Sequence, residues 1–229
     1  MTADPRLIVP LDLPSVAEAR QMVEVLDDAV SFYKIGLELL ATDGMAFARD
    51  LKRQDKQVFL DWKLHDIGAT VERSARVLAG AGCDLLTVHA EPQVMAAAVK
   101  AKGGSSLKIL AVTVLTSLTD ADLIEMGYAF GTRDLVARRI RQAVECGVDG
   151  IVSSPQEAAL AREIAGPDFL VVTPGVRPFW AAKNDQARAA TPADALKAGA
   201  SHLVCGRPIT AANDPREAAL KVVAEMAAI

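Results

Sequence analysis

The chain has 229 residues, of which 51% are hydrophobic and 24% are charged, and its formal net charge is -4. This length and apolar content allow residues 1–229 to bury one core as a single domain. Acidic and basic residues are mixed along the chain without a basic tail or stripe, so we expect no nucleic-acid partner. No run of about 18 apolar residues occurs, so we expect no membrane span.

Cysteine usage and the N-terminal sequence suggest a cytoplasmic location. The opening MTADPRLIVPLDLP lacks the basic region and apolar stretch that are typical of a secretory signal. Cys83, Cys146 and Cys205 are far apart and form no CxxC pair, so we expect reduced, mostly buried thiols. The three histidines show no HxH or HxxxH spacing, and we therefore expect no zinc site.

Short apolar runs rich in β-branched residues alternate along the chain with longer segments of helical periodicity. The expected strands are Leu7–Leu11, Phe32–Ile35, Val58–Trp62, Leu85–Val88, Ile109–Leu115, Gly150–Val152, Leu170–Thr173 and Leu203–Cys205. Helical spacing is clear in Val16–Leu26, Glu72–Ala81, Leu135–Cys146 and Ala158–Ile164. Eight such units of about 29 residues each predict an α/β fold, a single (β/α)8 TIM barrel with parallel strands inside and helices outside.

The segment DWKLHDIGAT, residues 61–70, holds the densest group of chemically active residues. The apolar run VFL ends at Asp61, and strand alternation points Asp61 and Lys63 to the same side. Asp66 and Thr70 follow, where the chain turns into the next helix. Active sites of α/β barrels lie at the carboxyl ends of the strands, so this segment is a candidate site.

Two other expected strands also end in charged residues. Asp12 follows the run IVPL, and Lys34 lies near the end of SFYKIG. A single charge at a strand end is usually a solvated cap. A set of two aspartates and two lysines at neighbouring strand ends is harder to explain in that way, so we expect Asp12, Lys34, Asp61 and Lys63 to act together.

The longest segment without clear periodicity is Pro174–Ala190, which directly follows an expected strand. A loop of this length in a compact domain is usually either functional or a disordered surface segment. Phosphate sites of such barrels are usually built by the loops after strands seven and eight. Arg177 lies in the first of these loops and Gly206-Arg207 in the second, and a guanidinium can hold a phosphate with two donors. We therefore expect 174–190 to close over a phosphate.

The sequence resembles the orotidine 5'-phosphate decarboxylase family along its whole length. DWKLHDIGAT is similar to the family signature D-x-K-x-x-D-I-x-x-T. The segments VPLD, YKIG, TVHA, VTVLTS, VTPGVRP, NDQAR and VCGRPI follow the family in the same order. One departure is Phe179-Trp180-Ala181-Ala182, where small or polar residues are common in the family, and this leaves the loop's dynamics open.

The resemblance implies conversion of orotidine 5'-phosphate (OMP) to uridine 5'-phosphate (UMP), the last step of de novo UMP biosynthesis, without a cofactor or metal. Lys63 is expected to protonate pyrimidine C6 after CO2 leaves, and Asp61 to lie against the substrate carboxylate. Lys34 and Asp66 complete the charge network. The resemblance further implies a homodimer in which Asp66 and Thr70 come from the neighbouring subunit.

The resemblance also assigns the groups that bind substrate. Asp12 and Lys34 are expected to hold the ribose hydroxyls, and Thr70 to reach the ribose across the subunit interface. Thr116 is expected to contact the pyrimidine ring. The phosphate is expected to be held by Arg177, Gln186, Gly206 and Arg207.

Elementary chemistry supports an electrostatic mechanism independently. Loss of CO2 leaves an electron pair at C6, where no carbonyl can accept it, and the sequence carries no cofactor motif that could act as an electron sink. A fixed ammonium near C6 would stabilise the carbanion and supply its proton. Alternating lysines and aspartates keep every buried charge paired.

Two other functions fit part of this pattern. The first is a metal-dependent sugar-phosphate decarboxylase or aldolase, which would share the D-x-K-x-x-D core. Those relatives resemble one another in an acidic residue at the end of strand two that helps to bind Mg²⁺, whereas Lys34 would repel a cation there. The second is a non-catalytic phosphometabolite sensor, which would be expected to lose Lys63 or Arg177, and both are present.

Overall fold

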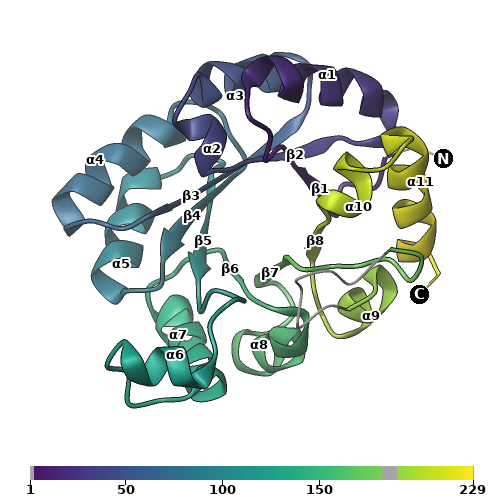
Figure 1. The fold of residues 1–229 in the computed structure, drawn as a ribbon. Helices are drawn as coiled ribbons and strands as arrows, with labels where there is room; N and C mark the ends of the chain where they lie inside the picture. The colour runs from purple at the N-terminus through teal and green to yellow at the C-terminus, as the bar shows by residue number, and fades with distance from the viewer. Residues whose placement is uncertain (1–2, 182–189, 229) are drawn as a thin grey trace.

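Eight parallel strands close into a barrel in chain order, and β1 pairs with both β2 and β8. The structure, a computed structural model, describes residues 3–181 and 190–228. Figure 1 looks into the ring of strands and shows the helices surrounding it, which confirms the predicted (β/α)8 barrel. The strands are β1 Leu7–Pro10, β2 Phe32–Ile35, β3 Gln57–Leu64, β4 Leu85–His89, β5 Lys108–Val112, β6 Gly150–Val152, β7 Leu170–Thr173 and β8 His202–Val204.

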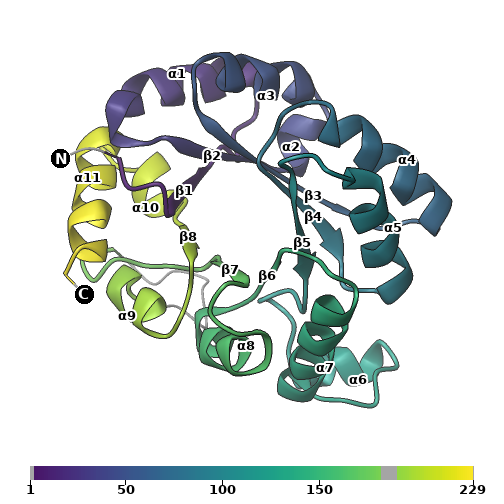
Figure 2. The ribbon, with the colours of Figure 1, turned by 180° about the vertical axis from the view of Figure 1, so that it is seen from behind.

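The helices follow the strands around the ring. They are α1 Val16–Leu26, α2 Leu37–Leu40, α3 Gly44–Arg53, α4 Gly68–Ala79, α5 Pro92–Lys102, α6 Asp120–Glu125, α7 Thr132–Glu145, α8 Ala158–Ala165, α9 Pro192–Lys197, α10 Arg207–Thr210 and α11 Pro215–Met226, with the short 3-10 helices η1 Asp27–Ala29 and η2 Pro155–Glu157. Seen from behind, α11 lies beside α1, so the last helix completes the ring next to the first (Figure 2). No helix in the described ranges is long and apolar enough to cross a membrane.

Local sequence signals account for several element ends. Ser15 caps α1 by accepting a hydrogen bond from the N–H of Glu18. Gly82 and Gly147 follow helices with φ angles of 75° and 73°, a left-handed conformation that glycine adopts without a Cβ clash. Each glycine lies two residues before the aspartate that precedes the next strand, so the two strand entries are built alike.

Strand bounds differ from the predicted ones mainly at β3 and β5. The predicted Val58–Trp62 is longer in the structure, where β3 continues to Leu64 and pairs there with Val88. The predicted Ile109–Leu115 is shorter, because regular pairing of β5 ends at Val112. An apolar run marks buried residues but does not show where the ladder of hydrogen bonds stops.

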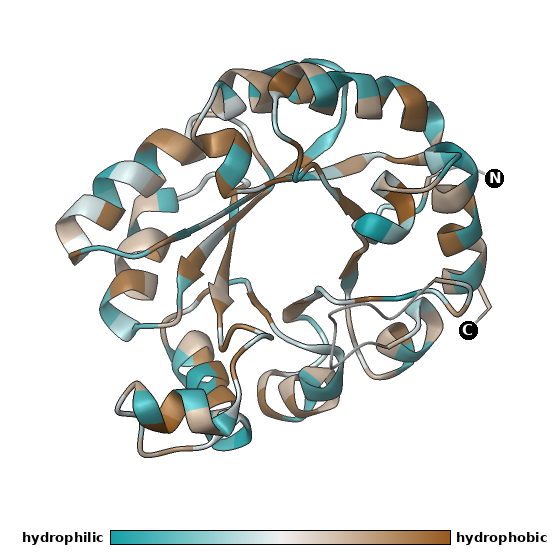
Figure 3. Cartoon of the chain, viewed as in Figure 1, coloured by the Kyte–Doolittle hydropathy of each residue, from teal (hydrophilic) through white to brown (hydrophobic). Residues whose placement is uncertain are grey.

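The core has two parts. A large cluster fills the space between strands and helices. A smaller cluster fills the inside of the barrel, so the barrel is packed rather than open, and it comprises Ile8, Phe32, Phe59, Leu85, Leu110, Val172 and Val204. Figure 3 shows the corresponding pattern, with apolar residues along the strands and many polar residues on the helices. The inner cluster forms an apolar floor below the polar residues at the carboxyl ends of the strands.

Candidate active site

Polar side chains stand directly above the inner apolar cluster, two residues further along the same strands. Successive side chains of a strand alternate between its faces, so positions i and i+2 both point into the barrel. This relation links Phe32 to Lys34, Phe59 to Asp61 and Leu85 to Thr87. Three neighbouring strands therefore bring a lysine, an aspartate and a threonine to one level at the carboxyl end of the barrel.

Lys34, Asp61 and Lys63 form an alternating charge network with Asp12. The Nζ of Lys34 lies 3.0 Å from Oδ1 of Asp12 and 3.3 Å from Oδ2 of Asp61. The Nζ of Lys63 lies 2.9 Å from Oδ1 of Asp61. Lys34 is buried and Asp61 nearly so, whereas Asp12 is open to solvent. The four charges predicted to act together are therefore joined by direct contacts.

The carboxylate of Asp61 is held in its ionised form. Burial disfavours that charge, but the charges of Lys34 and Lys63 and hydrogen bonds from Lys63 and Thr87 outweigh it and lower the pKa of Asp61 below its usual range. Asp61 therefore carries a negative charge at neutral pH, where its partners are two ammonium groups. A fixed anion between two fixed cations can stabilise a developing charge in a bound molecule.

The backbone at Lys63 has an unusual conformation. Its φ angle is 46°, in the left-handed region that residues with a Cβ rarely adopt. The β3–β4 register also shifts, since Leu60 pairs with Leu86 but Leu64 pairs with Val88. The sequence predicted Asp61 and Lys63 on one side by plain strand alternation. In the structure they meet across an irregular stretch of β3, where alternation alone does not describe the backbone.

Thr87 and Gly36 belong to this site, although the sequence interpretation did not select them. The hydroxyl of Thr87 donates to Oδ1 of Asp61 at 3.0 Å. A Cβ on Gly36 would lie 2.6 Å from Oδ1 of Asp12, so a side chain there would displace the Asp12–Lys34 pair. A sequence signal existed for Gly36, which directly follows the strand of Lys34, whereas Thr87 is an ordinary threonine within a strand.

A cavity of about 170 Å³ opens beside the charge network. Its floor is apolar and is shared with the inner cluster through Phe59 and Val204. Thr116, predicted to contact the pyrimidine ring, lines it. The lining residues are Lys34, Phe59, Asp61, Lys63, Val112, Val114, Leu115, Thr116, Val152, Ser153, Pro174 and Val204. An apolar hollow with two lysines and an aspartate on one wall suits a flat, charged ring.

The residues predicted to hold phosphate follow β7 and β8, which are neighbours in the barrel. Arg177 is buried and its N–H donates to the carbonyl of Ala190 at 2.9 Å, so the described ends of segment 174–190 meet. Arg207 is exposed at the start of α10. A Cβ on Gly206 would lie 3.0 Å from Cγ of Pro10, which leaves little room for a side chain. Gln186 lies outside the described residues.

Comparison with known proteins adds to this geometry. The family profile described as orotidine 5'-phosphate decarboxylase / HUMPS matches residues 5–222. The chain belongs to this family. It is 90% identical over 229 residues to the orotidine 5'-phosphate decarboxylase of Caulobacter sp. (strain K31), with 100% of each chain covered. It is 82% identical over 233 residues to that of Caulobacter vibrioides (strain NA1000 / CB15N), again with 100% of each covered.

A solved structure agrees with both the family and the fold. The crystal structure of orotidine 5'-phosphate decarboxylase from Lactobacillus acidophilus matches with a TM-score of 0.86 and 36% sequence identity, covering 98% of this chain and 100% of that chain. The resemblance drawn from the sequence motifs is therefore confirmed. The matched profile also includes HUMPS proteins, but both full-length relatives, at 90% and 82% identity, are orotidine 5'-phosphate decarboxylases.

Among the described contacts, Asp66 and Thr70 form no ion pair or hydrogen bond with the charge network of their own chain. Asp66 is exposed and its Oδ1 accepts the N–H of Ile67 at 2.6 Å. Thr70 accepts a hydrogen bond from Arg73 at 3.2 Å. Within the described ranges, no ion pair involves Asp66. In the described structure, Asp66 and Thr70 therefore contact none of Asp12, Lys34, Asp61 and Lys63.

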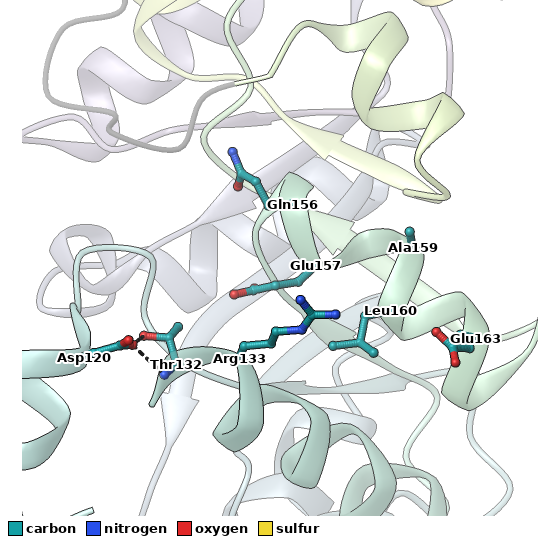
Figure 4. Close-up of a pocket in the computed structure, with 8 residues that line it drawn as sticks. All are labelled: Asp120, Thr132, Arg133, Gln156, Glu157, Ala159, Leu160 and Glu163. Carbon is teal, nitrogen blue, oxygen red and sulfur yellow. Dashed lines mark hydrogen bonds between the residues drawn. The ribbon is translucent and has the colours of Figure 1, made fainter. Parts of the chain in front are cut away.

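A larger hollow of about 650 Å³ lies outside the barrel, between α6, α7 and α8. Figure 4 shows its residues, with Asp120 accepting hydrogen bonds from the N–H and hydroxyl of Thr132 at one side. Arg133 is exposed and Glu163 lies at the opposite side. This hollow contains none of Asp12, Lys34, Asp61 and Lys63. Size alone therefore does not identify the candidate site in this family member.

Proposed function

We propose that this chain decarboxylates OMP to UMP, the last step of de novo UMP biosynthesis. The observation that carries the proposal is the Lys34–Asp61–Lys63 network, with contacts of 3.3 Å and 2.9 Å, on the wall of an apolar-floored cavity. The test is to incubate purified protein with OMP and to measure UMP and CO2. Release of both in equal amounts is the expected result, and no turnover at micromolar enzyme would contradict the proposal.

Lys63 is proposed as the proton donor. When the bond between C6 and the carboxylate breaks, its electron pair remains on C6, and the proton from Nζ of Lys63 completes the product. The ammonium also stabilises the negative charge while it develops. Asp61 would lie against the departing carboxylate, and their repulsion would be relieved as CO2 leaves. The contact between Lys63 and Asp61 supports this arrangement, because it fixes the ammonium before substrate enters.

The remaining site residues are proposed to orient the nucleotide. Asp12 and Lys34 would bind the ribose hydroxyls, and Thr116 would contact the ring from the cavity wall. Phosphate would bind to the loops after β7 and β8. The residues proposed there are Arg177, Gln186, Gly206 and Arg207. Binding energy from this remote group can be used to close the loop and to organise the reacting centre.

Cofactor-free chemistry is favoured over the metal-dependent alternative by the position of Lys34. Its ammonium lies between the carboxylates of Asp12 and Asp61, at 3.0 Å and 3.3 Å, where a divalent cation would otherwise find its ligands. A second cation there would meet strong repulsion. Dialysis against EDTA should therefore leave OMP turnover unchanged. A loss of turnover that added Mg²⁺ restores would favour the metal-dependent sugar-phosphate decarboxylase or aldolase instead.

We also propose a homodimer with shared sites, in a single-domain protein of the cytoplasm. The exposed position of Asp66, away from its own Lys63, supports a role across a two-fold interface. The test is to mix Lys63→Ala and Asp66→Asn chains. In a mixed dimer one site carries both defects and the other carries neither, so random exchange should leave roughly a quarter of all sites intact. No regained activity despite verified exchange would place Asp66 in its own subunit's site.

A further inference from the structure

Thr87 occupies a central place beside the charge network and has no assigned role. It lies on β4, its side chain is fully buried, and it faces the irregular stretch of β3. Its Oγ1 accepts the backbone N–H of Lys63 at 3.0 Å and donates to Oδ1 of Asp61 at 3.0 Å. One hydroxyl therefore contacts both the backbone of the proposed proton donor and the side chain of its carboxylate partner.

The direction of these hydrogen bonds follows from the chemistry of the groups. A backbone N–H can only donate, so the Thr87 oxygen must accept from Lys63. The single hydroxyl hydrogen then has two acceptors within reach, Oδ1 of Asp61 at 3.0 Å and the carbonyl of Leu60 at 3.4 Å. The carboxylate is closer and charged, and charge-assisted hydrogen bonds are the stronger ones. The hydroxyl therefore points to Asp61.

The irregular backbone of β3 explains why such a contact is needed. Between the pairs Leu60–Leu86 and Leu64–Val88, β3 has two more residues than β4, so not every N–H can join the regular ladder. The N–H of Lys63 finds the Thr87 side chain instead. A left-handed residue with a Cβ is unfavourable and persists where its surroundings hold it. The Thr87 hydroxyl is one contact that holds it.

We propose that Thr87 is a positioning residue that fixes the Lys63 backbone and the Asp61 carboxylate together and so sets the direction in which the Lys63 ammonium points. This inference rests on the proposed decarboxylation for its kinetic consequence, but its geometric consequence is independent of substrate. Burial alone would raise the pKa of Asp61. The charges of the two lysines outweigh this effect, and the hydrogen bond from Thr87 adds a smaller lowering effect.

The test uses three variants. Thr87→Val keeps the shape and removes the hydroxyl, and Thr87→Ser restores a hydroxyl. Thr113→Val is the matched control, because Thr113 is equally buried and its hydroxyl donates only to the carbonyl of Val152, at 3.1 Å, among the described contacts. If Thr87→Val does not fold, as judged by thermal unfolding, Thr87→Ala takes its place.

Loss of one charge-assisted hydrogen bond at a reacting centre corresponds to about a 10- to 100-fold change in rate. We expect this fall in kcat for Thr87→Val, with KM changed by less than about threefold, since the phosphate contacts remain. Thr87→Ser should recover kcat to within about threefold of the wild type, and Thr113→Val should stay within the same range. A kcat for Thr87→Val equal to that of Thr113→Val, or a Thr87→Ser as slow as Thr87→Val, would overturn the proposal.

A crystal structure of Thr87→Val separates this inference from the proposed function. We expect Lys63 to leave the left-handed conformation or its Nζ to move away from Asp61. An unchanged φ and an unchanged contact of 2.9 Å would refute the positioning role whatever the enzyme does with OMP. Absence of OMP turnover in the wild type would instead refute the proposed function, and the crystallographic comparison would still decide on Thr87.

Discussion

Aspartate–lysine pairs occur at both ends of the barrel, in different surroundings. At the amino ends of the strands, Asp84 accepts from Nζ of Lys52 at 2.8 Å and from the backbone N–H of Val58 at 2.7 Å. Asp149 is arranged in the same way, with Lys102 at 2.5 Å and a backbone N–H of the neighbouring strand. Both carboxylates complete a strand ladder, and both Lys52 and Lys102 come from the end of a helix.

At the carboxyl ends of the strands the arrangement is reversed. Asp61 contacts two lysines and the hydroxyl of Thr87 and accepts no strand N–H among the described contacts. The nearby backbone N–H of Lys63 donates instead to the side chain of Thr87. The lysines come from strands and point over an apolar floor. We therefore expect an aspartate–lysine pair to be structural where it satisfies the backbone and to take part in chemistry where a distorted backbone presents it.

The sharpest test of this comparison replaces one lysine from each end. The side chains of Lys63 and Lys52 are each 27% exposed, and each pairs with one aspartate. Lys63→Ala should lower kcat by at least about 10³-fold, because proton transfer and charge stabilisation are lost together. Lys52→Ala should leave kcat unchanged and lower the free energy of unfolding. Steady-state kinetics with OMP and urea unfolding measure both, and similar kcat values for the two variants would remove the distinction.

Arginines offer the next comparison. Near the amino ends, Arg162 donates to the backbone carbonyls of Gly199 and Pro167 at 2.7 Å and 2.8 Å, a structural clamp. Arg177 and Arg207 follow strands at the carboxyl end. Replacing either by Ala should reduce kcat/KM for OMP on the order of 10²-fold, since a charge-assisted contact to phosphate is lost. Turnover of orotidine, which lacks the phosphate, should barely change.

Arg162→Ala is the control for this experiment. It should destabilise the fold and affect OMP and orotidine alike, because its partners are carbonyls at the opposite end of the barrel. If Arg177→Ala or Arg207→Ala also slowed both substrates equally, the two arginines would not act through phosphate.

The sequence predicted the barrel because short apolar runs alternate regularly with segments of strong helical periodicity. Six of the eight predicted strands need at most small changes at their ends. The ends of β3 and β5 could not be predicted, since they depend on pairing with β4 and β6 rather than on local composition. Apolar residues continue past the end of β5, whereas β3 continues past the apolar run into polar residues.

Within the site, charged residues were easier to predict than the groups that position them. Lys34, Asp61 and Lys63 stand out because charge beside a buried strand is unusual. Thr87 does not, because a threonine in a strand is ordinary and its role depends on the neighbouring strand's register shift. Asp66 and Thr70 remain predictions, since their proposed partners belong to a second chain. Gln186 also remains a prediction.

A third prediction concerns stability alone. Asp149 is 15% exposed and pairs with Lys102 and Lys108 while accepting a backbone N–H. Asp149→Ala should lower the free energy of unfolding by about 2–4 kcal/mol, because a partly buried lysine and a strand N–H lose their acceptor. The kcat of the folded enzyme should not change. Urea unfolding at fixed protein concentration measures the first, and a parallel loss of kcat would mean that the amino end of the barrel also shapes the active site.

The smallest expected effect distinguishes the two ends by pH. Burial lowers the pKa of His202 at the amino end of β8; the charge of Asp4 opposes this shift and that of Arg6 adds a smaller lowering effect. Burial also lowers the pKa of His89 at the carboxyl end of β4, with Glu91 opposing it. Each unfolded histidine then binds a proton more readily than the folded one. The contribution of these histidines to the free energy of unfolding should therefore be fully present above pH 6.5, the ordinary histidine pKa. It should decrease as the pH falls below that value.

One group can change the unfolding free energy by no more than about 1.4 kcal/mol per pH unit. We expect His202→Gln to flatten the decrease between pH 7.5 and pH 5.5 more than His89→Gln, because His202 is the more deeply buried ring. Asp61 does not interfere, since its lowered pKa places its titration in more acidic solution. Urea unfolding of the three proteins at both pH values decides the point. If His89→Gln flattened the decrease in unfolding free energy more than His202→Gln, the carboxyl end of the barrel would account for more of the acid sensitivity. That result would contradict the structural role assigned to the amino end.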